Sequence, residues 1–300
     1  MMPTMGECVL ITGSTGLIGA ALVRKFAADG HAVFAAARNV WKARQMFEGL
    51  ENVRVVEWDV TRPAAFEVGS IDWLVHAASE TSSRAFVGNP DGVREVIVEG
   101  TRNVLAFAKA AQVKSMVYLS TFEVMLGLKG VRASYPDAKL AAEALCRASG
   151  LNVSIARLAQ TFGEGVRHDD GRVFAEFARA ILEKRDIVLK TEGTTARCYC
   201  YLGDAVEAIR ILLEKGVRGE TYVVANEETH CSIREMAEML IAAHPEAGSK
   251  LVIDTADVAS RGFAPPFQMK LDSSPLRALG WQPKVGLVAM YDRMMAGMVE

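Results

Sequence analysis

The chain has 300 residues, of which 50% are hydrophobic and 23% charged, and its formal net charge is −2. This composition predicts a globular protein with one large domain and a smaller lobe. The small net charge and the lack of long runs of like charge argue against nucleic acid as a partner. No apolar run reaches the roughly 18 residues that span a bilayer, and the start of the chain lacks a signal-peptide pattern, so we expect no membrane partner and a cytoplasmic location. The five cysteines include no Cys-x-x-Cys pair, which argues against a metal site or a disulfide framework.

The first predicted elements are an apolar strand at residues 8–11, a glycine-rich turn and a helix over residues 16–29. Backbone N–H groups at a helix N-terminus bind pyrophosphate, and glycines let the main chain approach it. We expect Gly13 to allow the tight turn, Gly16 the close approach and Gly19 the packing of the helix on the sheet. A purely structural turn is the alternative. The predicted cofactor-binding residues here are Gly13, Thr15, Gly16, Leu17, Ile18 and Gly19.

The first half of the chain alternates apolar runs with helical segments, as parallel strands do when helices cover both faces of their sheet. This rhythm predicts an α/β fold with a doubly wound parallel sheet of the Rossmann type. The predicted helices over 93–111 and 135–149 are rich in small apolar residues, so they either cover the sheet or also form the contact of a homodimer. The apolar runs are residues 8–11, 32–36, 53–56, 71–75, 116–119 and 153–155.

The composition and the pattern of predicted elements change past Arg157, where helices and short strands mix and Gly, Pro and charged residues become more frequent. We place a boundary at residues 158 to 165. The expected domains are a dinucleotide-binding Rossmann domain over 1–158 and a smaller C-terminal α/β substrate lobe over 159–300. A segment around 198–215 is expected to return to the Rossmann domain.

The end of the second predicted strand, Ala36-Ala37-Arg38-Asn39, bears on the choice of cofactor. An acidic residue here selects the free 2′-hydroxyl of NAD(H), whereas a basic residue suits the 2′-phosphate of NADP(H). Arg38, supported by Lys42 or Arg44, therefore favours NADP(H), with NAD(H) as the alternative because an arginine also stacks on adenine.

The third and fourth predicted strands end in further cofactor candidates. Asp59, followed by Val60, is expected to contact the adenine, although an aspartate that opens a turn is an equally ordinary loop residue. His76, Ala77 and Ala78 end the fourth strand with small residues that let a cofactor pass close by. The His76 side chain itself is expected to be packed rather than catalytic.

Tyr135 and Lys139 are spaced so that they face each other on one side of a helix. A cation about 4 Å from the phenol is worth about 4 kcal/mol at a dielectric of about 20, so we expect Lys139 to lower the pKa of Tyr135 by roughly three units. Tyr135 would then act as acid or base during hydride transfer. Thr121 ends the fifth predicted strand, at the edge where doubly wound sheets bind ligands, and is expected to hydrogen-bond the reacting oxygen, with strand capping as its alternative role.

These motifs together resemble the extended short-chain dehydrogenase/reductases, in particular the NAD-dependent epimerase/dehydratase family that acts on nucleotide sugars. The resemblance implies a Thr121, Tyr135 and Lys139 triad in which the lysine also holds the nicotinamide ribose. It places Glu123 where family dehydratases and decarboxylases carry a glutamate. The motifs that carry the resemblance are Thr-Gly-x-x-Gly-x-x-Gly at 12–19, His-Ala-Ala at 76–78, Ser-Thr-x-Glu-Val at 120–124 and Tyr-x-x-x-Lys at 135–139.

The C-terminal half extends the resemblance to substrate binding. Gln160 stands where the family often contacts the diphosphate, and Arg197 with Tyr199 is similar to a motif that places an arginine on the same group. Arg261 is a weaker candidate for a second contact. The segment between Thr121 and Tyr135 is short for the family, which puts the particular sugar in doubt.

Phe122 replaces the acid that family dehydratases place before the glutamate, so simple dehydration is disfavoured. The leading hypothesis is therefore an NAD(P)-dependent nucleotide-sugar enzyme that transfers hydride at a sugar carbon, as an epimerase, a decarboxylase or a 4-ketosugar reductase. The alternatives are an NADPH-dependent reductase of a small carbonyl compound, similar to dihydroflavonol reductases, and a non-catalytic dinucleotide-binding protein.

Overall fold

The computed structural model describes residues 6–81, 86, 88–129, 133–255 and 266–299. The chain divides into two compact units, each formed by segments that are distant in the sequence. The first unit contains Met1–Leu158, Val206–Val223 and Ala278–Trp281. The second contains Ala159–Ala205, Val224–Arg277 and Gln282–Glu300.

The first unit is built on a seven-stranded sheet with the order β10-β6-β5-β4-β1-β2-β3. Every neighbouring pair from β3 to β6 is parallel. Because the chain moves outward from β1 first in one direction and then in the other, the sheet is doubly wound, and the predicted fold class is confirmed. The strands are β1 (Cys8–Thr12), β2 (Ala32–Ala37), β3 (Val53–Glu57), β4 (Trp73–His76), β5 (Ser115–Thr121), β6 (Val153–Leu158) and β10 (Thr221–Val224).

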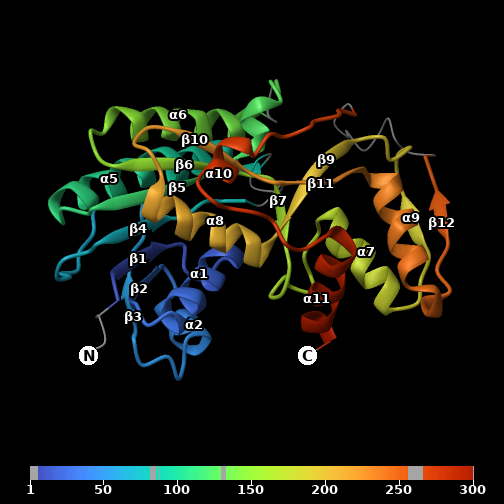
Figure 1. Ribbon diagram of the computed structural model, residues 1–300, viewed down its shortest axis with the longest axis horizontal. Coiled ribbons are helices and arrows are strands. Elements are labelled where there is room, and N and C mark those ends of the chain that lie inside the picture. The colour runs from blue at the N-terminus through green and yellow to red at the C-terminus, as the bar shows by residue number, and fades with distance from the viewer. Residues whose placement is uncertain (1–5, 82–85, 87, 130–132, 256–265, 300) are drawn as a thin grey trace. The chain divides into compact units, whose positions relative to one another are not determined.

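Helices cover both faces of this sheet, with α5 and α6 on one side and α1 on the other (Figure 1). The sheet-facing side chains of α5 and α6 are small, such as Ala108, Ala138 and Ala142, and belong to one buried core with Leu74 and Met116 of the strands. A π-helical turn, Glu95–Glu99, joins α4 to α5. The helices are α1 (Leu17–Ala28), α2 (Val40–Met46), α4 (Pro90–Arg94), α5 (Gly100–Ala110), α6 (Ser134–Ala148) and α8 (Leu202–Lys215), which begins in the second unit.

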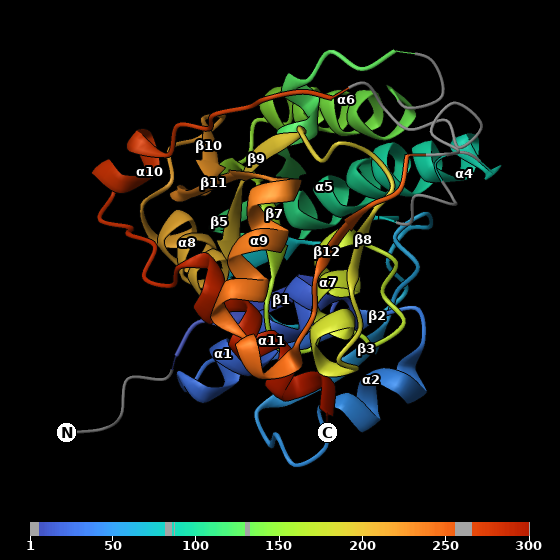
Figure 2. The same ribbon diagram turned by 90° about the vertical axis from the view of Figure 1, so that its right-hand side faces the viewer.

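The second unit has two small sheets and a helical layer. Strand β9 lies between β7, to which it is parallel, and β11, to which it is antiparallel, while β8 pairs with β12. Helices α7, α9 and α11 lie side by side (Figure 2). These elements are β7 (Gln160–Phe162), β8 (Ile187–Leu189), β9 (Ala196–Tyr201), β11 (Asn226–Ser232), β12 (Leu251–Ile253), α7 (Val173–Leu182), α9 (Ile233–Ala243), α10 (Ser274–Ala278) and α11 (Leu287–Val299). No helix among the described residues is both long and apolar enough to cross a bilayer.

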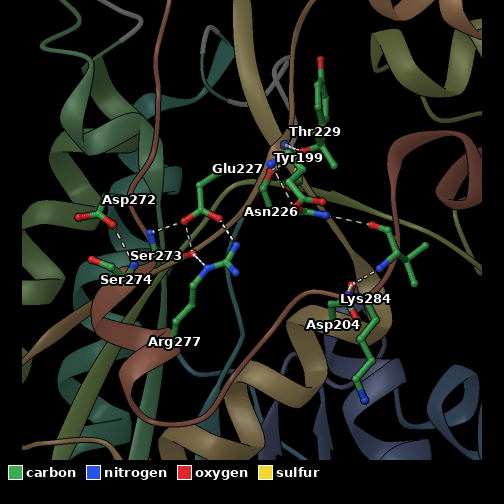
Figure 3. Close-up of polar contacts among 12 residues, drawn as sticks. Tyr199, Asp204, Asn226, Glu227, Thr229, Asp272, Ser273, Ser274, Arg277 and Lys284 are labelled. Atoms are coloured by element: carbon green, nitrogen blue, oxygen red, sulfur yellow. Dashed lines mark hydrogen bonds and ion pairs between the residues drawn. The ribbon is translucent and has the colours of Figure 1, made fainter.

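Polar contacts fix the beginning of β11 within the second unit (Figure 3). The Glu227 carboxylate accepts hydrogen bonds from the backbone N–H and the hydroxyl of Ser273, and it forms an ion pair with Arg277. Asn226 donates to the carbonyl of Val285. Burial opposes ionisation of Glu227, but the contacts with Ser273 and Arg277 outweigh it and lower the pKa of this carboxyl to about 2.

The low pKa of Glu227 predicts how stability changes in acid. The folded-state pKa of Glu227 lies below its ordinary value of 4.5. The stabilisation that the ionised Glu227 carboxylate gives to the fold is therefore fully present above pH 4.5 and is lost as the pH falls from 4.5 toward 2. For the partly exposed pair this amounts to about 1–2 kcal/mol. The variant Glu227→Gln is expected to lose this part of the acid dependence, measured as free energy of unfolding by urea between pH 7 and pH 3. The exposed neighbour variant Glu228→Gln should retain it, and equal curves for the two variants would contradict the assignment.

Candidate active site

The glycine-rich turn between β1 and α1 passes close to the chain that follows β4. Gly13 has a φ of +66°, and a Cβ there would lie 2.7 Å from the backbone of Ala78 at the end of β4. A Cβ on Gly19 would lie 2.2 Å from the Gly13 carbonyl oxygen, so Gly19 lets the helix pack against the turn itself. A side chain at Gly13 would therefore force the turn away from the chain after β4, and one at Gly19 would force α1 away from the turn.

The first turn of α1 fits a phosphate group. Gly16 is the N-cap residue, it offers no side-chain cap to the free N–H groups, and the first turn contains no acidic residue. A Cβ on Gly16 would meet only the Gly13 carbonyl oxygen, at 3.3 Å. The N–H groups and the positive end of the helix are thus open to an anion, as a dinucleotide pyrophosphate requires.

His76 is buried within a continuous hydrogen-bond chain. Thr101 donates its hydroxyl proton to the carbonyl of Ile97, so it accepts from His76 Nε2 at 3.2 Å. The other ring nitrogen, Nδ1, accepts from Thr12 at 2.8 Å, and Thr12 accepts from the N–H of Ala78. Burial lowers the pKa of His76 to about 3, so the ring is neutral. Both nitrogens are engaged inside the first unit, as expected for a packed histidine, and a contact from the His76 ring to a cofactor would displace one of these bonds.

Tyr135 lies on the first turn of α6, where its phenol is close enough to the hydroxyls of Thr121 and Ser79 for both to lower its pKa. Its ring stacks on Phe86, with centroids 4.6 Å apart. Burial raises the pKa of Tyr135 and the Glu123 carboxylate raises it further, so the net shift is upward. The expected triad residues and Glu123 are therefore brought together within the first unit.

Lys139 lies one helical turn after Tyr135 and is 3% exposed. Its Nζ donates to the Leu119 carbonyl at 2.8 Å and lies 5.0 Å from the ring centre of Tyr118 and 5.8 Å from that of Tyr135. Burial lowers the pKa of Lys139 to about 7. The prediction that Lys139 lowers the pKa of Tyr135 is wrong, because burial raises this pKa and Glu123 raises it further.

The residues predicted to hold the adenosine half lie at the ends of β2 and β3. Arg38 and Lys42 are exposed, and Asn39 caps α2 by accepting from the Lys42 N–H at 2.9 Å. Burial opposes ionisation of Asp59, but hydrogen bonds from Thr61 and the charge of Arg38 together lower the pKa of its carboxyl. Arg38 and Asp59 therefore interact electrostatically at this edge of the sheet. Their contact with a cofactor remains a prediction.

The substrate candidates of the second unit lie on neighbouring strands. Gln160 of β7 is the register partner of Tyr199 on β9, and both strands end at one edge of the small sheet. The Arg197 guanidinium lies over Phe267 at 5.2 Å, and its Nε is buried without a hydrogen-bond partner within the described residues. Tyr199 is fully buried, which favours a packing role for its ring over a direct ligand contact. Arg261 lies outside the described residues.

Ser79 and Phe86 are two contacts of Tyr135 that the sequence did not single out. Ser79 directly follows the His-Ala-Ala motif, so its place at the end of β4 was the available signal. Phe86 carries no signal, because it contacts Tyr135 only through the tertiary fold. Within the described part of the chain, no group of three His, Cys, Asp or Glu side chains is arranged to hold a metal ion.

The doubly wound sheet, the glycine turn and the Tyr–Lys pair define a nicotinamide-dinucleotide enzyme of the short-chain dehydrogenase/reductase class. The sequence profile described as the NAD dependent epimerase/dehydratase family matches residues 9–225. UDP-glucuronic acid decarboxylase 6 of Arabidopsis thaliana is 30% identical, across 93% of this chain and 85% of that protein. UDP-glucuronic acid decarboxylase 1 of Xenopus tropicalis is 28% identical, across 93% of this chain and 69% of that protein. The chain belongs to the NAD-dependent epimerase/dehydratase family.

Solved structures share the fold at lower sequence identity. A variant of UDP-glucuronic acid 4-epimerase from Bacillus cereus, in complex with NAD and a fluorinated UDP-glucuronic acid, superposes with a TM-score of 0.82 at 19% identity, covering 97% of this chain and 98% of that one. UDP-glucose 4-epimerase from Thermotoga maritima gives a TM-score of 0.78 at 19% identity, with the same coverage.

The glycine turn leads to a stability prediction. Gly13→Ala combines a left-handed backbone with a steric clash against Ala78, so it is expected to cost about 3–5 kcal/mol in free energy of unfolding. Gly49 also has a positive φ, of +80°, but a Cβ there meets nothing within 4 Å, so Gly49→Ala should cost only about 1–2 kcal/mol. Urea unfolding of both variants checks the difference. Equal losses would show that the close approach of β1 and β4 at Gly13 is unimportant.

Proposed function

We propose that this protein is a nucleotide-sugar enzyme that acts on UDP-glucuronic acid, with Tyr135 as the acid/base. The observation that carries the proposal is the position of the Tyr135 phenol, which interacts with the hydroxyls of Thr121 and Ser79 at the ends of β5 and β4. This is the edge of the sheet at which doubly wound folds bind their ligands. Curated relatives support the substrate, since UDP-glucuronic acid decarboxylases 3, 5 and 6 of Arabidopsis thaliana are 29–30% identical across 93% of this chain.

The chemistry of the chain's own residues is proton transfer at one substrate hydroxyl. Thr121 holds the hydroxyl group, and Tyr135 takes its proton as a sugar carbon is oxidised. Because burial raises the pKa of Tyr135, removal of its proton needs a nearby positive charge during turnover, and Lys139 is the basic residue that α6 supplies one turn away. A bound oxidised nicotinamide ring would bring a positive charge to this edge and would supply the hydride acceptor.

Oxidation of the ring hydroxyl β to the carboxyl group of a uronic acid would give a β-keto acid, which loses carbon dioxide. Of the outcomes considered, decarboxylation therefore suits this substrate best. Glu123, whose charge acts on Tyr135, is proposed as a second acid/base beside it. In the second unit, Arg197 is proposed to bind the diphosphate, since a guanidinium matches phosphate oxygens and its Nε lacks a partner among the described residues.

The acid/base role predicts a large loss of turnover in Tyr135→Phe. Without the hydroxyl, consumption of UDP-glucuronic acid should fall by about 10²–10⁴-fold, while binding of UDP changes little. Tyr118→Phe is a matched control, because that ring also lies beside Lys139 Nζ but its hydroxyl has no assigned role. The measurement is carbon dioxide release and product mass. Wild-type turnover in Tyr135→Phe would refute the proposal, and activity on simple ketones but on no nucleotide sugar would favour the small-carbonyl reductase.

We also propose that NADP(H) binds more tightly than NAD(H), because exposed Arg38 and Lys42 stand at the end of β2 and the residues that end this strand include no acidic side chain. Arg38→Ala is expected to weaken NADP⁺ binding by about 10- to 100-fold and to leave NAD⁺ binding nearly unchanged. Calorimetric titration measures both affinities, with Arg54→Ala as the exposed-arginine control. Tighter binding of NAD⁺ than of NADP⁺ to the unmodified protein would show the preference to be wrong.

A further inference from the structure

Glu143 carries a buried carboxylate on α6, and three side chains from three elements donate to it. Its side chain is 0% exposed. Arg157 of β6 donates from two nitrogens, at 2.9 Å to Oε1 and 2.8 Å to Oε2. Ser120 of β5 donates to Oε1 at 2.7 Å, and Arg147 of the same helix donates to Oε2 at 3.0 Å. Although burial opposes ionisation, these contacts lower the pKa of Glu143, so it is an anion at neutral pH.

The donors on the sheet are placed by strand register. Ser120 and Arg157 are direct partners in the parallel pair β5–β6, so both reach the same carboxylate from one face of the sheet. Ser120 immediately precedes Thr121, whose hydroxyl interacts with Tyr135. Glu143 therefore attaches α6, which carries Tyr135, to the strand end that carries Thr121.

Glu143 is also one helical turn from Lys139, on the same face of α6. The titratable and charged groups around Lys139 are Tyr135, Glu143 and Cys146 of α6, His76 of β4, Tyr118 of β5 and, through Glu143, Arg157 of β6.

Most of these groups are neutral at pH 7. Burial raises the pKa of Cys146 to about 12 and lowers that of His76 to about 3, and it raises the pKa of Tyr118 and Tyr135. Among the named groups Glu143 is thus the anion that stabilises the buried ammonium. If Glu143 were uncharged, no negative charge among these groups would offset the positive charges of Arg147 and Arg157 near Lys139.

We propose that Glu143 is a positioning residue, which keeps Lys139 protonated and holds α6 on β5 and β6 so that Tyr135 stays at Thr121. Its importance for turnover rests on the proposed function, in which the Lys139 cation assists Tyr135. The effect on Lys139 itself does not depend on that function.

The test is a titration of Lys139 in the full chain carrying Glu143→Gln, which removes the charge and nearly preserves the shape. Proteins labelled with ¹³C at lysine Cε are titrated by NMR, and the Lys139 signal is assigned by its absence in Lys139→Arg. The pKa of Lys139 is expected to fall by about one unit or more, because a neighbouring anion favours the ammonium. The high-pH limb of turnover on UDP-glucuronic acid should move down by the same amount, since activity requires the protonated lysine.

Asp137→Asn is the matched control, because it removes an exposed carboxylate from the same helix, two positions from Lys139. It should leave the pKa of Lys139 unchanged. If Glu143→Gln does not fold, Ser120→Ala removes one donor and keeps the charge, and kcat is expected to fall several-fold at constant KM. An unchanged Lys139 pKa in Glu143→Gln, or a wild-type kcat in Ser120→Ala, would overturn the proposal even where Tyr135→Phe is inactive. Full activity of Tyr135→Phe would instead refute the proposed function.

Discussion

The burial of a cationic side chain beside the Tyr135 phenol is the constraint on which this site depends. Burying an ammonium is costly unless it is paired and hydrogen-bonded. Lys139 has one carbonyl, two aromatic rings and the neighbouring Glu143 anion for this purpose. These partners come from α6 and β5, so the state of the lysine depends on how the helix lies on the sheet. Because the pKa of Lys139 is about 7, nearby charges strongly affect whether this side chain is protonated at neutral pH.

The carboxyl edge of the parallel sheet brings the glycine-rich turn and Tyr135 into one region of the first unit. In the sheet register, Thr12 of β1 is the partner of His76 on β4, and His76 is the partner of Tyr118 on β5. The chain from Ala78 through Thr12 and His76 to Thr101 reinforces this register with side-chain bonds. A neutral, packed histidine suits this role, because a charged ring would lose the acceptor at Nδ1.

In the second unit, Arg197 and Tyr199 belong to one sequence motif on β9 but lie in different surroundings. Along β9, Arg197, Tyr199 and Tyr201 point to one face, and Cys198 and Cys200 point to the other. Tyr199 packs with Phe162 in the aromatic core, whereas Arg197 lies at the beginning of the strand and is only partly buried. Tyr199 is therefore enclosed by other side chains, whereas Arg197 is partly exposed, because their positions along the strand determine how deeply each is buried.

The sequence by itself determined the strands of the parallel sheet, the glycine turn and the pairing of Tyr135 with Lys139. Each of these follows from local chemistry: continuous apolar runs, backbone freedom at glycine and the period of a helix. The seventh strand, β10, was not predicted, because a short apolar run in the C-terminal half gives no sign that it returns to the first sheet. The tertiary structure alone decided the direction of the Tyr135 pKa and the partners of Glu143. Desolvation and long-range contacts set both quantities, and neither is encoded in the spacing of residues along the chain.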